Sequence, residues 1–173
     1  MKILNNTQHS VFNLFLLIVV LHISACSDWF DDDEDDAGTD NSLTSSTTCY
    51  APHLATGIFV PVVELRGPTF GNAFAIANYN ANGYPVITYG PRFFEEPKLI
   101  QKFIELHECA HLSQLTSDEI LANCFALQGM RNLGLTNEQE NQIAIWHYSM
   151  TNIAPQYGGT GENFWNMTLA CAG

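Results

Sequence analysis

The chain has 173 residues, of which 46% are hydrophobic, and its formal net charge is −12 at pH 7. A chain of this length and composition forms one domain with a hydrophobic core and is short for two. Because no basic patch or basic helix face accompanies the acidic residues, the composition argues against nucleic acid as a partner.

The negative charge is concentrated near the N-terminus. Eight of the 18 acidic residues fall between Asp28 and Asp40, whereas ten acidic and five basic residues follow from Cys49 onward. Residues 26–48 also end in a run of serine and threonine and hold few apolar side chains. Like-charge repulsion and the lack of a core predict a disordered tether over this segment.

An apolar run from Val11 to Ile23 precedes the tether. It is shorter than the roughly 20 residues that cross a bilayer, and its length and flanks predict a secretory signal peptide over residues 1–25. The run ends in Ile23-Ser24-Ala25-Cys26, which resembles the lipobox of bacterial lipoproteins. This resemblance implies a membrane anchor through lipid on Cys26 and a place in the bacterial cell envelope. The next residue is Ser27 and not the aspartate that serves as an inner-membrane retention signal in enteric bacteria, which favours the outer membrane. An ordinary signal peptide with a coincidental cysteine is the alternative.

Residues 49–173 are the expected folded domain, and their first part carries strand patterns. Three short apolar runs predict strands, and an Asn-Gly turn signal between the last two predicts a hairpin; the runs are 57–65, 73–78 and 85–89. From Glu96 the apolar residues recur with helical spacing.

Four helical segments follow in the pattern. The first runs from Glu96 to Gln114, and the second begins at a cap on Thr116 or Ser117 and ends near Leu133. The third follows a capping box at residues 136–139 and ends near 150, and a last short one surrounds residue 165. Strands followed by helices predict the α+β class.

The first predicted helix carries an HExxH motif, His107-Glu108-Cys109-Ala110-His111. Histidines four residues apart project from one helical face, so both imidazoles can reach a single zinc ion. Glu108, beside them, is expected to activate the water that attacks a substrate carbonyl. The alternative is a helix with two unrelated histidines. The metal is favoured because Ile100 and Ile104 bury the same face, where histidines need partners.

Glu119 is the expected third ligand, since it falls in the first turn of the second helix, directly after a tight turn. Asp118 is the rival, although its direction differs by about 100°. Either carboxylate also provides favourable charge at a helix N-terminus. Asn123, one turn further on, is expected to orient a ligand.

These motifs together resemble the gluzincin metallopeptidases. Over residues 71–127, Asn72-Ala73-Phe74-Ala75, HECAH and Glu119-x-x-Ala122-Asn123 resemble the M48 family, the Ste24 and HtpX type. The resemblance implies a minimal zincin-like domain with one Zn²⁺ per chain, and a strand holding Asn72 and Ala73 that pairs with the substrate backbone. The chain departs from the family in three ways: a very short connection to Glu119, Asn123 in place of aspartate, and the lack of transmembrane helices around the domain.

His147 and Tyr148 on the third helix are candidates for stabilising an oxyanion, as downstream residues do in related zincins; packing beside Trp146 is the alternative for His147.

Four cysteines remain beside Cys26, and in an exported protein they are expected to form disulfides. Cys109 and Cys124 stand at similar heights on two antiparallel predicted helices. The expected pairs are therefore Cys109–Cys124 and Cys49–Cys171.

The sequence thus predicts a zinc-dependent endopeptidase that hydrolyses peptide or protein substrates in the cell envelope. The alternative is a catalytically silent zinc-binding lipoprotein that acts as a binding or assembly factor. The presence of Glu108 favours the enzyme, because a purely structural zinc site has no use for that carboxylate.

Overall fold

A computed structural model describes residues 48–69, 71, 73–151 and 153–173. The predicted signal peptide, the expected lipidation site Cys26 and all but the last residue of the predicted tether lie outside the described residues. Within the described part of the chain, no helix is long and apolar enough to cross a membrane. The order is strands first and helices afterwards, so the predicted α+β class is confirmed.

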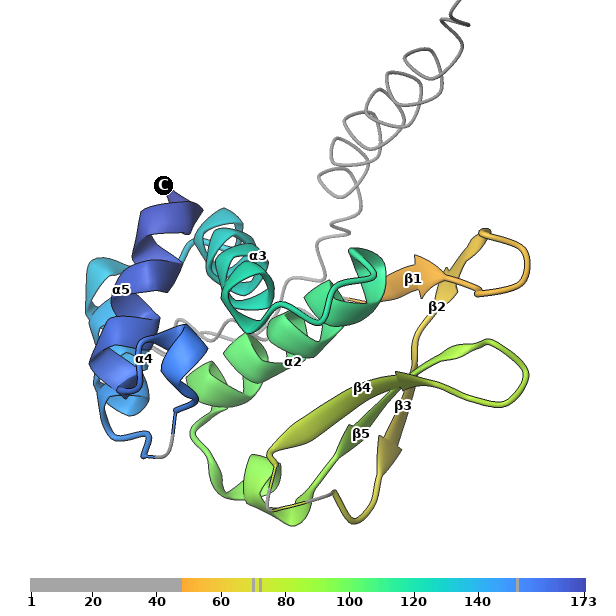
Figure 1. Ribbon diagram of the computed structural model, residues 1–173, viewed down its shortest axis with the longest axis horizontal. Helices are drawn as coiled ribbons and strands as arrows, with labels where there is room; N and C mark the ends of the chain where they lie inside the picture. The colour runs from red at the N-terminus through yellow and green to blue at the C-terminus, as the bar shows by residue number, and fades with distance from the viewer. Residues whose placement is uncertain (1–47, 70, 72, 152) are drawn as a thin grey trace, which may run out of the picture. The chain divides into compact units, whose positions relative to one another are not determined.

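In the part of the chain that the structure describes, five strands form two small sheets (Figure 1). One sheet pairs β1 (Tyr50–Pro52) antiparallel with β2 (Phe59–Pro61). The other has the order β3-β5-β4, in which β5 (Pro85–Tyr89) runs parallel to β3 (Val63–Arg66) and antiparallel to β4 (Ala75–Tyr79). The strand β4 therefore lies at one edge of its sheet.

The predicted strand over 57–65 is two strands that belong to different sheets. Pro61 has no backbone N–H to donate, and β2 ends at this residue. The N–H of Val62 bonds to the carbonyl of Cys49, and β3 begins at the next residue.

The predicted hairpin joins β4 to β5. Its turn is held by the side chain of Asn80, whose Oδ1 accepts hydrogen bonds from the backbone N–H of Asn82 and Tyr84. Gly83 has a φ of 83°, a conformation that favours glycine.

Among the described residues, the helical part contains four α-helices and two short 3-10 turns, η3 (Pro91–Glu95) and η4 (Pro155–Tyr157). The α-helices are α2 (Lys98–Ser113), α3 (Glu119–Asn132), α4 (Asn137–Tyr148) and α5 (Gly161–Ala172). The capping box between Thr136 and Gln139 is confirmed. The cap of α3 is Asp118 rather than Thr116 or Ser117, because the Thr116 hydroxyl accepts the N–H of Asp118 instead.

Helix α2 lies between the sheet and the other helices (Figure 1). It contacts β4 and β5 on one side and α3 and α4 on the other. The core therefore spans both sides of α2 and includes Ile87 from the sheet, Phe103 from α2, and Leu127 and Trp165 from the helical side. A helix buried on both sides has little freedom to turn, which fixes the direction of the side chains it carries.

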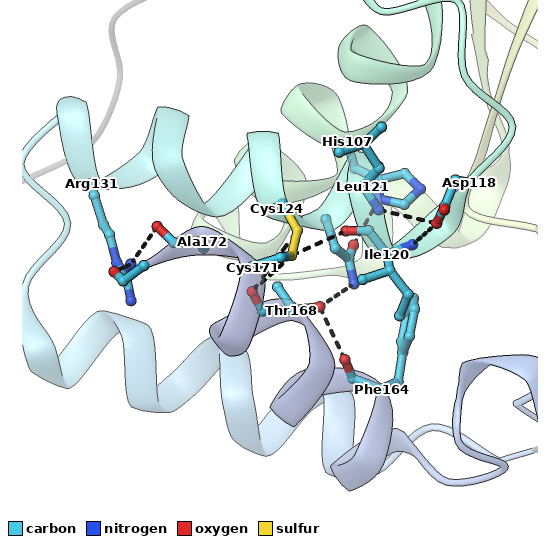
Figure 2. Close-up of a disulfide and its surroundings, with 12 residues drawn as sticks. His107, Asp118, Ile120, Leu121, Cys124, Arg131, Phe164, Thr168, Cys171 and Ala172 are labelled. Carbon is cyan, nitrogen blue, oxygen red and sulfur yellow. Dashed lines mark hydrogen bonds between the residues drawn. A yellow bond between two sulfur atoms is a disulfide. The ribbon is translucent and has the colours of Figure 1, made fainter.

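The predicted disulfide pairing is wrong. The structure pairs Cys49 with Cys109 and Cys124 with Cys171, with Cα atoms 5.8 Å apart in each pair. The first bond ties the beginning of the domain to α2, and the second joins α3 to α5 (Figure 2).

Helix rotation explains the difference, because similar height on two helices does not make two side chains face each other. Helices α2 and α3 meet through His107 and Asn123. Cys109 is two residues from His107, which is a rotation of about 200°, and it points toward β1. Cys124 is turned by about 100° from Asn123 and faces α5.

Candidate metal centre

The HExxH motif lies in the second half of α2, on the side that meets α3. His107 and His111 are one turn apart, and their ring centroids are separated by 4.6 Å. Their side chains are mostly buried, with 15% and 13% exposed. The helix thus presents both rings to one small volume, as the spacing predicts.

A compact turn after α2 brings Glu119 back to the histidines. Leu115 has a φ of 49°, and the N–H of Thr116 bonds to the carbonyl of His111. Asp118 then caps α3 through its side chain, which accepts the N–H groups of Ile120 and Leu121. Capping occupies the Asp118 carboxylate, and the next residue, Glu119, points toward α2.

The three expected ligand atoms converge. Nε2 of His107 lies 3.0 Å from Nε2 of His111 and 3.0 Å from Oε2 of Glu119, and the His111–Glu119 distance is 3.4 Å. Zinc ligands at about 2.1 Å in tetrahedral directions lie about 3.4 Å apart. A group of His107, His111 and Glu119 with this spacing could hold a metal ion.

The other ring nitrogens are already engaged, which tests the fit further. Nδ1 of His111 donates to the backbone carbonyl of Thr116 at 2.9 Å, and Nδ1 of His107 donates to Oδ1 of Asn123 at 2.7 Å. With these protons on Nδ1, the neutral rings present their Nε2 lone pairs to each other and to a carboxylate. Two lone pairs and a negative charge at one point favour a cation there, and the donor set fits zinc.

The closeness of the two histidines and Glu119 also shifts the pKa values of Glu119 and His111. When the histidine rings are protonated, hydrogen bonds from His107 and His111 hold the pKa of Glu119 well below its usual range, against the effect of burial. Burial alone would lower the pKa of His111, but its hydrogen bonds with Glu119 and Thr116 outweigh burial and raise it. The centre therefore stabilises a negative carboxylate beside a positive group.

Glu108 lies next to this centre on the side of the sheet. Its side chain is buried, and burial raises the pKa of its carboxyl group. The neighbouring histidines oppose that rise, and so does a hydrogen bond from the backbone of Ala77 in β4. A carboxylate held this way, next to a metal position, is placed to accept a proton.

A cleft of about 760 Å³ runs past the centre and is lined on one side by β4. The pairing of β4 with β5 is continued at its two ends by hydrogen bonds between Phe74 and Gly90 and between Asn80 and Tyr84. The alternation of an antiparallel ladder then turns the backbone groups of Ala75 and Ala77 away from β5, along the open edge.

Ala73, one of the two residues expected to bind the substrate backbone, lies just before this edge. Ala73 lines the cleft but precedes β4, and its carbonyl accepts the hydroxyl of Thr69 at 2.6 Å. Asn72 lies outside the described residues.

The two oxyanion candidates have different surroundings. His147 is 1% exposed, and both of its ring nitrogens are engaged, Nδ1 with the carbonyl of Ile143 and Nε2 with the amide of Asn123. In this arrangement the ring offers no N–H to a substrate. Tyr148 is 49% exposed at the end of α4 and is not among the residues that line the cleft.

No protein-family model matches this chain, and comparisons with curated proteins and with solved structures find no match either. The gluzincin assignment remains a prediction from the motifs.

Three groups that hold the centre had no signal in the sequence. They are backbone groups or distant side chains: the carbonyl of Thr116, the backbone of Ala77 and the hydroxyl of Thr168. Asn123 and His147 also support the centre; the sequence had singled out Asn123 for orienting a ligand and His147 for a different role.

Proposed function

We propose that this protein is a zinc-dependent endopeptidase of the gluzincin type, with a zincin-like fold. The observation that carries the proposal is the convergence of His107, His111 and Glu119 on one point, beside Glu108 and in a cleft lined by a strand edge. His107, His111 and Glu119 would hold the ion, and Glu108 remains outside the ligand set.

A bound zinc would supply Lewis acidity, polarising a carbonyl and lowering the pKa of water. The carboxylate of Glu108 takes the proton from water as the water oxygen attacks the peptide carbonyl carbon. The same carboxyl group then gives that proton to the leaving nitrogen as the C–N bond breaks. The raised pKa of the buried Glu108 carboxyl supports both transfers, since a stronger base accepts a proton more readily.

The cleft supports an extended polypeptide as the substrate. A peptide in extended form can add to a strand edge through main-chain hydrogen bonds. The outward backbone groups of Ala75 offer such an edge, together with the outward carbonyl of Ala77, whose N–H is bonded to Glu108. The two disulfides support an exported location, because such bonds persist in oxidising compartments. A lipid anchor at Cys26 in the bacterial envelope, at the outer membrane, remains part of this proposal.

Glu108→Gln tests the mechanism. The variant should keep zinc and lose hydrolysis of an unstructured polypeptide by about 10²- to 10⁴-fold. Glu105→Gln is the matched control, because Glu105 lies on the same helix but pairs with Lys102; it should keep its activity. Equal hydrolysis by Glu108→Gln would exclude the mechanism. A wild-type protein that binds zinc but cleaves no peptide would instead favour the binding or assembly role.

A further inference from the structure

A buried chain of hydrogen bonds continues from His107 into the helical core. Asn123 accepts from His107 through Oδ1, and its Nδ2 lies 3.3 Å from Nε2 of His147 and 3.2 Å from the hydroxyl of Thr168. Asn123, His147 and Thr168 are each 2% exposed or less. Since water does not reach these side chains, their donors and acceptors must match one another.

Two backbone carbonyls determine the direction of this chain of bonds. The carbonyl of Ile143 accepts from Nδ1 of His147 at 2.9 Å, so the proton of the neutral ring is on Nδ1 and Nε2 is an acceptor. The carbonyl of Phe164 accepts the hydroxyl of Thr168 at 3.0 Å, as Figure 2 shows, so the lone pairs of that oxygen face Asn123.

The orientation of the Asn123 amide follows from these two acceptors. Its NH₂ group must face His147 and Thr168, which leaves its oxygen for His107. An oxygen acceptor at that position requires the proton of His107 on Nδ1. Nε2, the atom that faces His111 and Glu119, is then left with a lone pair.

We propose that His147 is a positioning residue of the metal centre: with Thr168 it orients the Asn123 amide and so selects the tautomer of His107 that binds metal. This inference rests on the proposed metal site but not on catalysis. It also gives a reason for asparagine where the resembled family has aspartate. An aspartate here would turn an acceptor oxygen toward two further acceptors.

The surroundings of His147 suit this role and no direct part in the reaction. Its ring lies among aromatic side chains, 4.7 Å from Trp165 and 5.2 Å from Phe103 between ring centroids. Gly161 at the start of α5 lies against the carbonyl of His147, where a Cβ atom would overlap that oxygen. Aromatic packing thus holds the ring in place while Nε2 faces the amide.

The test compares the zinc affinity of three variants of the full chain by competition with a chromogenic chelator. His147→Phe keeps an aromatic ring but removes the acceptor, and should weaken zinc binding about tenfold. His147→Gln keeps an acceptor and should stay within about threefold of the wild type. Ile87→Val in β5 is the matched control, because Ile87 is fully buried but has no part in this chain of bonds: the change removes a buried methyl group, lowers the thermal midpoint and should leave the affinity unchanged.

Equal affinities for His147→Phe and Ile87→Val would overturn the inference, and so would a His147→Gln variant as weak as His147→Phe. A second measurement does not depend on zinc binding. Long-range ¹H–¹⁵N spectra at pH 7 should place the ring proton of His147 on Nδ1, with or without zinc. A proton on Nε2 would overturn the inference, whereas a wild-type protein without zinc affinity would overturn the proposed function.

Discussion

The disulfide between Cys49 and Cys109 should contribute a large share of the stability of this domain. It closes a loop with a sequence separation of 60 residues. In the chain-entropy description, a loop of that length stabilises the folded state by about 4 kcal/mol at 25 °C. The Cys124–Cys171 bond, with a separation of 47, should contribute about 4 kcal/mol as well, because the effect grows only with the logarithm of loop length. Small domains have total stabilities of about 5–15 kcal/mol.

The double variant Cys49→Ala with Cys109→Ala measures this contribution by urea unfolding at 25 °C. Tryptophan fluorescence, to which Trp165 in the core contributes, follows the transition, and a chelator in every sample removes any stabilisation by bound metal. With a slope of about 2 kcal/mol per molar urea, the midpoint should fall by about 2 M. A matched variant, Cys124→Ala with Cys171→Ala, should show a similar fall. A loss below about 1 kcal/mol in both would refute the reasoning from loop length.

The same proteins test the pairing itself. Removing Cys49 and Cys109 together should release no additional thiol, because the other two cysteines stay bonded to each other. If the pairs were instead Cys109–Cys124 and Cys49–Cys171, the double variant would leave Cys124 and Cys171 as two free thiols. A thiol assay in denaturant distinguishes these outcomes.

Two further predictions concern the connecting turn and the buried imidazole. Leu115 is 61% exposed and has a left-handed φ of 49°, a conformation that asparagine tolerates better than leucine, so Leu115→Asn should raise the free energy of unfolding by about 1 kcal/mol in chemical denaturation. Leu115→Ala keeps the strained Cβ atom and should not raise it. Equal effects of the two variants would contradict the backbone strain at Leu115. Burial lowers the pKa of His147 to about 4, whereas the unfolded chain titrates near 6.5. The unfolded state therefore binds the extra proton between these values, and stability should fall by up to about 3 kcal/mol as the pH drops from 6.5 to 4. Parallel stability curves for the wild type and His147→Gln would contradict this assignment.

Local patterns in the sequence predicted much of the fold and of the candidate site. The Asn-Gly signal found the hairpin, and the capping box at Thr136 marked the start of α4. The four-residue spacing of His107 and His111 was sufficient to predict that both rings reach the same point, since this depends only on helix geometry. The closeness of Glu119 in sequence indicated a turn, and the turn exists with Leu115 in an unusual conformation.

Features that depend on the rotation of one element against another could not be predicted. The pairing of Cys109 depends on which face of α2 meets α3, and the spacing of the cysteines does not contain that angle. The role of His147 depends on Asn123, 24 residues earlier, and on Thr168 in the last helix. The division of residues 57–65 between two sheets depends on which partner strand each half finds.

Zinc content is the most direct test of the central claim. The purified wild-type protein, prepared without chelator and analysed by elemental mass spectrometry, should hold about one zinc per chain. His107→Ala and Glu119→Gln should lose it. Asp118→Asn is the matched control, since asparagine still caps α3 and the Asp118 side chain bonds to backbone N–H groups rather than to the centre; it should keep its zinc. A wild-type protein without zinc, or Glu119→Gln and Asp118→Asn with equal zinc, would contradict the metal centre described above.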